Sequence, residues 1–189
     1  MKSALNNGGL RGDCFPPASS LVESSSGRGH MTWKQICLDP RFRDLPFKIE
    51  LNKRGQIIMS PTRNFHGFFA FKIGEQIRKH LPDGEVIMEC AVDTADGTKE
   101  ADLAWVSKGR WAIICDEFSS SIAPEICVEV VSASNSREEM LRKRELYIKA
   151  GAQEYWICHE DGKLEFFGGS GVLKKSRMCP KFPGKIEKR

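Results

Sequence analysis

The sequence lacks any cysteine pattern that would hold a metal ion or form a redox pair. Its seven cysteines stand at positions 14, 37, 90, 115, 127, 158 and 179, so no two are near neighbours in the chain. Several lie in apolar runs, where reduced cysteines pack like small hydrophobic side chains. We therefore expect neither a zinc site nor disulfides.

Long apolar runs are also absent. No stretch approaches the ~20 apolar residues of a membrane-spanning helix, and the N-terminal region lacks the compact apolar core of a signal peptide. No internal repeat of solenoid length is visible. We expect a cytoplasmic protein.

Charge is only slightly unbalanced, with a formal net charge of +4. Much of the excess lies near the C-terminus, at positions 174, 175, 177, 181, 185, 188 and 189. Charge patterning favours a solvated tail there over a nucleic-acid-binding segment. The chain therefore shows no strong electrostatic signal for a polyanionic partner.

Composition predicts one globular domain. A chain of 189 residues with 40% hydrophobic content can bury one sizeable core. Residues 1–30 form a separate zone with a run of three serines and little periodic apolar content, typical of disorder or of an extension upstream of a true start at Met31. We predict an ordered domain over 31–170 and a basic tail over 171–189.

Hydrophobic periodicity predicts an α/β fold with a mixed sheet flanked by helices and an N-terminal β-hairpin. The hairpin strands are expected over 47–51 and 56–59, and a helix over 64–81. Further strands are expected over 85–92, 101–106, 125–131, 154–158 and 163–167, and a second helix over 137–150. The predicted core order is helix, three strands, helix, strand.

One acid stands where an apolar residue is expected. Glu129 lies inside Ile126-Cys127-Val128-Glu129-Val130-Val131, a run typical of a strand buried on both faces. An unpaired buried charge costs several kcal/mol, so this acid must be paired, protonated or bound to a cation. Binding to a cation, the last alternative, would indicate a catalytic site.

The second predicted helix carries a lysine on its apolar face. At 100 degrees per residue, Lys143 lies between Met140 and Tyr147 on one side and Leu146 on the other. The ammonium either snorkels to water or reaches a carboxylate on the neighbouring strand of Glu129.

Asp102 begins the otherwise apolar run 102–106. An isolated acid at a strand start is usually solvated, but adjacent strands can bring Asp102 and Glu129 within range of one cation. Two carboxylates and water molecules suit Mg²⁺, with Mn²⁺ as a substitute.

Several ordered segments resemble one protein family. They are Glu50-Leu51-Asn52-Lys53-Arg54-Gly55-Gln56, Met59-Ser60-Pro61 followed by His66, Lys99-Glu100-Ala101-Asp102-Leu103-Ala104-Trp105, Pro124-Glu125-Ile126-Cys127-Val128-Glu129-Val130-Val131-Ser132, the helix over 143–151, and Glu154-Tyr155-Trp156-Ile157. With these segments, residues 47 to about 183 resemble the Uma-two family of restriction endonucleases, a branch of the PD-(D/E)XK nuclease superfamily.

The resemblance implies metal-dependent hydrolysis of phosphodiester bonds, with Asp102 and Glu129 as metal ligands and the backbone carbonyl of Val130 as a further oxygen ligand. The chain departs from the superfamily pattern twice. Ala101 stands in place of the proline before the aspartate, and Val131 in place of the lysine two residues after the acid. The lysine role would therefore pass to Lys143.

Glu50 and His66 are second-tier candidates. The resemblance places Glu50 near the metal, although a salt bridge at the hairpin end explains it equally well. His66 lies near the start of the first predicted helix, where a neutral imidazole would contact a metal-bound water or a phosphate. A core histidine with a satisfied hydrogen bond is the competing interpretation.

The resulting prediction is a Mg²⁺-dependent endonuclease that acts on double-stranded DNA, as a homodimer by analogy with its superfamily. Replacing Asp102 or Glu129 with alanine is expected to abolish cleavage and to leave the fold intact. Two alternatives stay open. One is a catalytically silent nucleic-acid-binding or interaction module in which Lys143 neutralises Glu129, and the other is a phosphodiesterase for small nucleotides.

Overall fold

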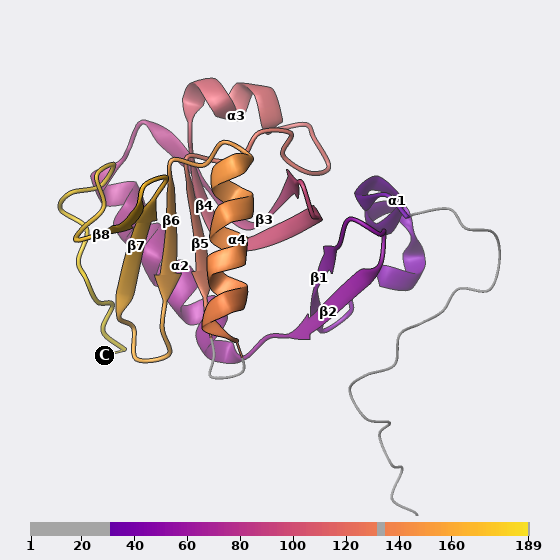
Figure 1. Ribbon diagram of the computed structural model, residues 1–189, viewed down its shortest axis with the longest axis horizontal. Helices are drawn as coiled ribbons and strands as arrows, with labels where there is room; N and C mark the ends of the chain where they lie inside the picture. Colours follow the sequence, from indigo (N-terminus) through magenta and orange to yellow (C-terminus); the bar gives the residue numbers. More distant parts are fainter. Residues whose placement is uncertain (1–30, 132–134, 189) are drawn as a thin grey trace, which may run out of the picture.

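The computed structural model of the chain describes residues 31–131 and 135–188. A six-stranded mixed sheet with the order β3-β4-β5-β6-β7-β8 forms its centre (Figure 1). The strands are β3 (Gly84–Thr94), β4 (Gly97–Ser107), β5 (Ile126–Val130), β6 (Glu154–Cys158), β7 (Leu164–Gly168) and β8 (Gly171–Leu173). Only the pair β5 and β6 is parallel. The predicted mixed sheet is confirmed.

Two helices cover the opposite faces of this sheet (Figure 1). Helix α2 (Asn64–His80) packs through Phe69, Ile73 and Ile77 against one face of β5. Helix α4 (Arg137–Lys149) connects β5 to its parallel neighbour β6 and packs against the other face. Because both faces are covered, every residue of β5 is buried.

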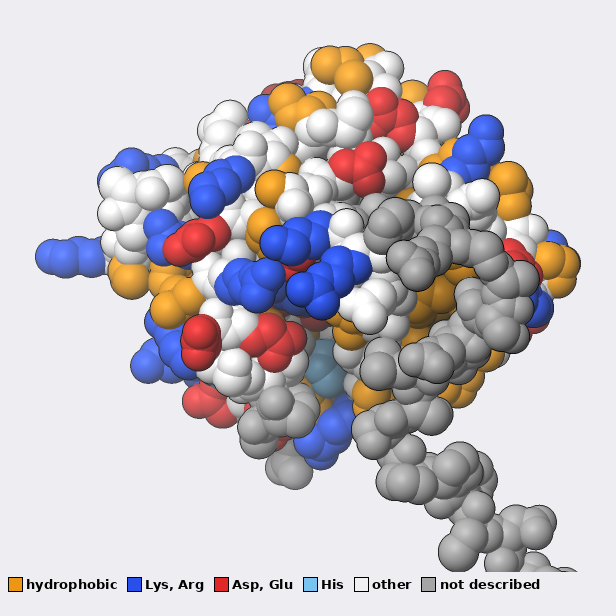
Figure 2. All heavy atoms as spheres, turned by 45° about the vertical axis from the view of Figure 1, so that its right-hand side comes forward, with side chains coloured by type: hydrophobic (Ala, Val, Ile, Leu, Met, Phe, Trp, Pro, Cys, Tyr) orange, Lys and Arg blue, Asp and Glu red, His pale blue; other side chains and the backbone are white. Residues whose placement is uncertain are grey.

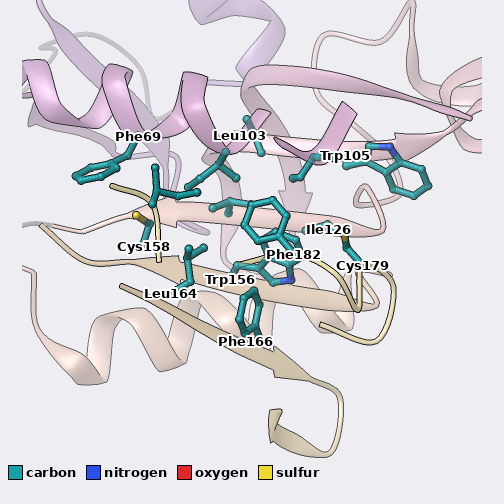
Figure 3. Close-up of a cluster of buried hydrophobic side chains, with 14 of the residues drawn as sticks. Phe69, Leu103, Trp105, Ile126, Trp156, Cys158, Leu164, Phe166, Cys179 and Phe182 are labelled. Atoms are coloured by element: carbon teal, nitrogen blue, oxygen red, sulfur yellow. The ribbon is translucent and has the colours of Figure 1, made fainter. Parts of the chain in front are cut away.

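Figure 3 shows the larger hydrophobic core, between α2 and the sheet. Leu103 and Trp105 of β4, Ile126 of β5 and Trp156 of β6 meet there. Cys127 of β5 and Val131, the residue after this strand, point to the α4 face instead, where they belong to a second buried cluster. Glu129 shares the face of Cys127 and Val131, so its carboxylate points toward α4.

The predicted N-terminal hairpin is present outside the main sheet. Strand β1 (Phe47–Leu51) pairs in antiparallel register with β2 (Ile57–Pro61), with Phe47 opposite Pro61. Helix α1 (Trp33–Leu38) and the short 3-10 helix η1 (Pro40–Phe42) precede it, and α3 (Lys108–Ile114) follows β4. The sequence did not predict α1, η1, α3 or β8.

The C-terminal segment is part of the core. Phe182 and Ile186 are buried, and the rings of Phe182 and Trp156 lie 4.7 Å apart between centroids. The backbone of Ile186 donates to the carbonyl of Gly162 at 2.8 Å. The lysines of this segment are exposed, but the segment as a whole is not the solvated tail that its charge suggested.

Residues 1–30, for which disorder is predicted, lie outside the described residues. Within the described ranges, no helix combines the length and the apolar character needed to cross a membrane.

Candidate active site

The candidate site lies where β4 and β5 separate. Their ladder pairs Trp105 with Ile126, Ala104 with Cys127 and Leu103 with Val128, and ends there. Asp102 is the next residue of β4, and its Oδ2 accepts a hydrogen bond of 2.6 Å from the backbone N–H of Val130. The carboxylate thus takes the place of a strand partner and is fixed beside β5.

Glu129 is buried, with only 3% of its surface exposed, and its carboxylate is fully paired. Oε1 accepts hydrogen bonds from the hydroxyl of Tyr147 at 3.0 Å and from Nζ of Lys143 at 3.1 Å. Oε2 accepts from Nζ of Lys48 at 3.0 Å. These three donors offset the desolvation that makes a charge in this strand costly.

Lys143 connects α4 to the hairpin as well as to β5. Its Nζ lies 2.7 Å from Oε1 of Glu50, which is also buried. The same oxygen of Glu50 accepts from the backbone N–H of Glu100 at 3.2 Å. The structure therefore brings together four of the predicted site residues: Glu50, Asp102, Glu129 and Lys143. Lys143 does not snorkel to water.

Lys48 is a site residue that the sequence analysis missed. Its Nζ lies 2.8 Å from Oδ1 of Asp102 and 3.0 Å from Oε2 of Glu129, and about 10% of its side chain is exposed. Lys48 and Glu50 are two positions apart in β1, so both point to the same side of the strand. Because Glu50 was already predicted to lie near the metal, the alternation of side chains along the strand would have placed Lys48 on the same side.

The charges in the cluster shift the proton affinities of its members. Burial alone would raise the pKa of the Glu129 carboxyl, but the positive charges of Lys143 and Lys48 hold this pKa below its ordinary value. Burial alone would likewise lower the pKa of the Lys48 and Lys143 ammonium groups, but the carboxylates around them raise both. At neutral pH, Glu129 is therefore a carboxylate between two ammonium groups.

These side chains line a cavity of about 420 Å³. His66 also lines this cavity, but its Nδ1 accepts a hydrogen bond of 2.9 Å from the backbone N–H of Arg63 at the start of α2. Its ring stacks on that of Phe65, with 4.3 Å between centroids. His66 thus makes a satisfied capping contact at the cavity wall, and in the described part of the chain it forms no ion pair with the acids.

The oxygen atoms of the site suit a hard divalent cation. Asp102 and Glu129 both lie within 3.0 Å of the same ammonium nitrogen, so they are close enough to share one cation. The N–H and C=O of a strand residue point to the same neighbouring strand, so the carbonyl of Val130 faces the side of Asp102. Among the described residues, no three acidic, histidine or cysteine side chains surround a common metal position. Mg²⁺ commonly binds through one or two carboxylates, with water and substrate phosphate completing its shell.

The fold and the site define a restriction-endonuclease-like α/β protein. A crystal structure described as "a putative nuclease belonging to DUF820", from Anabaena variabilis ATCC 29413, superposes with a TM-score of 0.63 and 14% sequence identity. The match covers 83% of this chain and 94% of that chain. At this identity the likeness shows the fold.

A family model described as "Putative restriction endonuclease" matches residues 39–172. The chain therefore belongs to the Uma-two family, which confirms the resemblance of its motifs. No curated protein matches the chain. Family and fold together support a nuclease-like function.

Proposed function

We propose that the protein is a Mg²⁺-dependent endonuclease that hydrolyses phosphodiester bonds of double-stranded DNA, with Mn²⁺ as a substitute ion. The observation that carries this proposal is the convergence of Asp102 and Glu129 at the strand separation, within 3.0 Å of one cationic nitrogen. Membership of a restriction endonuclease family supports a nucleic-acid substrate. By analogy with the superfamily, we propose a homodimer that cuts both strands.

In the proposed site, Asp102, Glu129 and the carbonyl of Val130 hold the cation. A bound Mg²⁺ would polarise the scissile phosphate and lower the pKa of a coordinated water. Val130 N–H fixes one oxygen of Asp102, and Tyr147 and Lys143 fix one oxygen of Glu129, so both carboxylates are held in place. Lys143 orients the attacking water and stabilises negative charge on the phosphate, while Glu50 holds its ammonium in position.

The surface around the site is mixed in charge. Figure 2 shows lysine and arginine side chains gathered near the middle of one face, with acidic side chains beside them. Arg142 and Lys99 line the cavity together with the site residues. Of these two, only Arg142 is exposed, and its positive charge beside the cavity would favour the approach of a phosphate backbone.

One observation favours a second candidate function. Lys48 and Lys143 together give each of Asp102, Glu129 and Glu50 an ion-pair partner from the protein itself. A catalytically silent nucleic-acid-binding module on the same fold would need no more than this. Metal dependence discriminates the two functions, because a silent module neither cleaves nor gains stability from Mg²⁺.

The test is nicking of supercoiled plasmid DNA in Mg²⁺, Mn²⁺ and EDTA. We expect cleavage by the wild type with either metal and none with EDTA. Asp102→Asn and Glu129→Gln, which keep side-chain shape, should lose cleavage while remaining folded. The matched control is Asp83→Asn, whose side chain is 93% exposed and should cleave like the wild type.

Three outcomes would contradict the proposal. Full nicking by folded Asp102→Asn would remove the site assignment. Absence of cleavage with every metal would favour the silent module. Hydrolysis of a small model phosphodiester without cleavage of DNA would favour a phosphodiesterase for small nucleotides.

A further inference from the structure

Lys48 holds the two carboxylate oxygens that a metal ion would need. Asp102 Oδ2 is already bound by the N–H of Val130, and Glu129 Oε1 by Tyr147 and Lys143. In the described part of the chain, the remaining oxygens, Asp102 Oδ1 and Glu129 Oε2, accept hydrogen bonds only from Lys48, at 2.8 and 3.0 Å. These two oxygens face the same nitrogen and so face a common position.

An ammonium and a divalent cation cannot both occupy that position. Mg²⁺ binds oxygen at about 2.0–2.1 Å, so it would need the space that Lys48 Nζ fills. Two cations in contact with the same pair of oxygens would also repel each other strongly in a buried site. Metal binding therefore requires that Lys48 move.

The structure offers the displaced ammonium a place to go. Lys48 and Asp102 line not only the site cavity but also a second cavity of about 380 Å³, next to α1. Glu89 and Glu100 line this second cavity. Two acidic side chains thus line the same cavity as Lys48 and are candidate partners for its displaced ammonium.

We propose that Lys48 is a positioning residue that occupies the metal position of the metal-free protein and that a divalent cation binds by displacing its ammonium. This inference rests on the proposed function, because it assumes that Asp102 and Glu129 bind metal. Lys48 then keeps the two acids together before the metal arrives and lowers metal affinity. Two other contacts still hold the hairpin in place. Glu50 pairs with Lys143, and Nζ of Lys99 donates a hydrogen bond of 2.9 Å to the carbonyl of Leu51.

The first test is calorimetric titration of metal-free protein with Mn²⁺. Lys48→Met removes the competing charge but keeps a flexible chain of similar length. We expect it to bind Mn²⁺ about tenfold more tightly than the wild type or better, which corresponds to about 1.4 kcal/mol. Lys53→Met makes the same change at an exposed position of the same hairpin and should bind like the wild type. Equal or weaker binding by Lys48→Met would overturn the inference.

A second measurement needs no variant at Lys48. Wild-type protein is acetylated with an amine-reactive ester, with and without saturating Mg²⁺, and each lysine is quantified by mass spectrometry. Lys48 should become several-fold more reactive when Mg²⁺ is bound, because its ammonium leaves the buried carboxylate pair. Exposed Lys53 is the internal reference and should not change. Unchanged reactivity of Lys48 in metal-saturated protein would show that it does not move.

The same titration separates this inference from the proposed function. Asp102→Asn removes one metal ligand and should abolish Mn²⁺ binding. If neither the wild type nor Lys48→Met binds Mn²⁺, the proposed metal site is wrong and the inference falls with it. If both bind with the same affinity, the metal site stands and only the role of Lys48 is refuted.

Discussion

Replacing Glu129 with alanine should destabilise the metal-free protein as well as inactivate it. The substitution removes the acceptor for Lys48, Lys143 and Tyr147, all of them largely buried. Breaking a buried ion pair by removal of one partner costs about 3–5 kcal/mol. Each ammonium keeps one carboxylate, Asp102 for Lys48 and Glu50 for Lys143, so we expect the low end, about 3 kcal/mol.

This expectation corrects the one drawn from sequence, that alanine at Glu129 leaves the fold intact. A loss of about 3 kcal/mol is a large fraction of the 5–15 kcal/mol that typically separates native from unfolded chains. The sequence revealed a buried acid and Lys143 as a candidate partner, but not Lys48 and Tyr147, which also hold it. An inactive Glu129→Ala protein alone would therefore not identify a metal ligand.

The assay is urea unfolding in EDTA, followed by the fluorescence of tryptophan, since Trp105 and Trp156 are buried in the core. Glu129→Gln keeps an acceptor oxygen and the side-chain shape, so its loss should lie between those of alanine and wild type. Glu187→Ala removes an exposed acid and should change the free energy of unfolding by no more than about 0.5 kcal/mol. A loss below about 1 kcal/mol for Glu129→Ala would refute the view that the lysines depend on this carboxylate.

Two further predictions concern the supports of the site and the core. Gly97 has a φ of +81°, and a side chain there would meet the carbonyl oxygen of Leu51 at 2.5 Å. Gly97→Ala should therefore speed hydrogen exchange of the β1 amides. The control is Gly109→Ala, which has open space around it and should leave this exchange unchanged. The carboxylate of Glu154 accepts hydrogen bonds from the backbone N–H groups of Arg177 and Met178 and from the indole of Trp156. Glu154→Gln should therefore lower the free energy of unfolding in urea by about 2 kcal/mol. It should also make the segment after Leu173 more sensitive to protease. Unchanged β1 exchange or unchanged protease sensitivity would contradict the respective prediction.

The sheet could be predicted because its strands follow strict local patterns, and the site acids because they interrupt those patterns. Strand β6 has the predicted bounds, and α4 begins at Arg137 as predicted, where the side chain of Ser136 accepts from the N–H of Glu139. Glu129 was identified because it is a charged residue in a strand buried on both faces. Lys143 was identified because it lies on the apolar face of its helix. Both arguments need only the periodicity of one element.

Other features depend on contacts between distant segments. Tyr147 reads as an ordinary core aromatic, and only the fold shows that its hydroxyl reaches Glu129. The apolar residues after Leu173 are sparse and lack a period, so Phe182 and Ile186 gave no local signal of burial. Their positions are fixed by pairing with residues near Gly162 and by the ring of Trp156.

The main core extends beyond the range that the family model matches. The family model ends at residue 172, yet Cys179, Phe182 and Ile186 belong to the main core. A chain cut at that boundary would leave Trp156 and Phe166 without the aromatic ring that covers them and would expose apolar surface next to an open strand. Such a surface promotes association with other chains. We therefore expect a chain cut at residue 172 to associate more readily than the full chain, because residues outside the matched range cover part of its core.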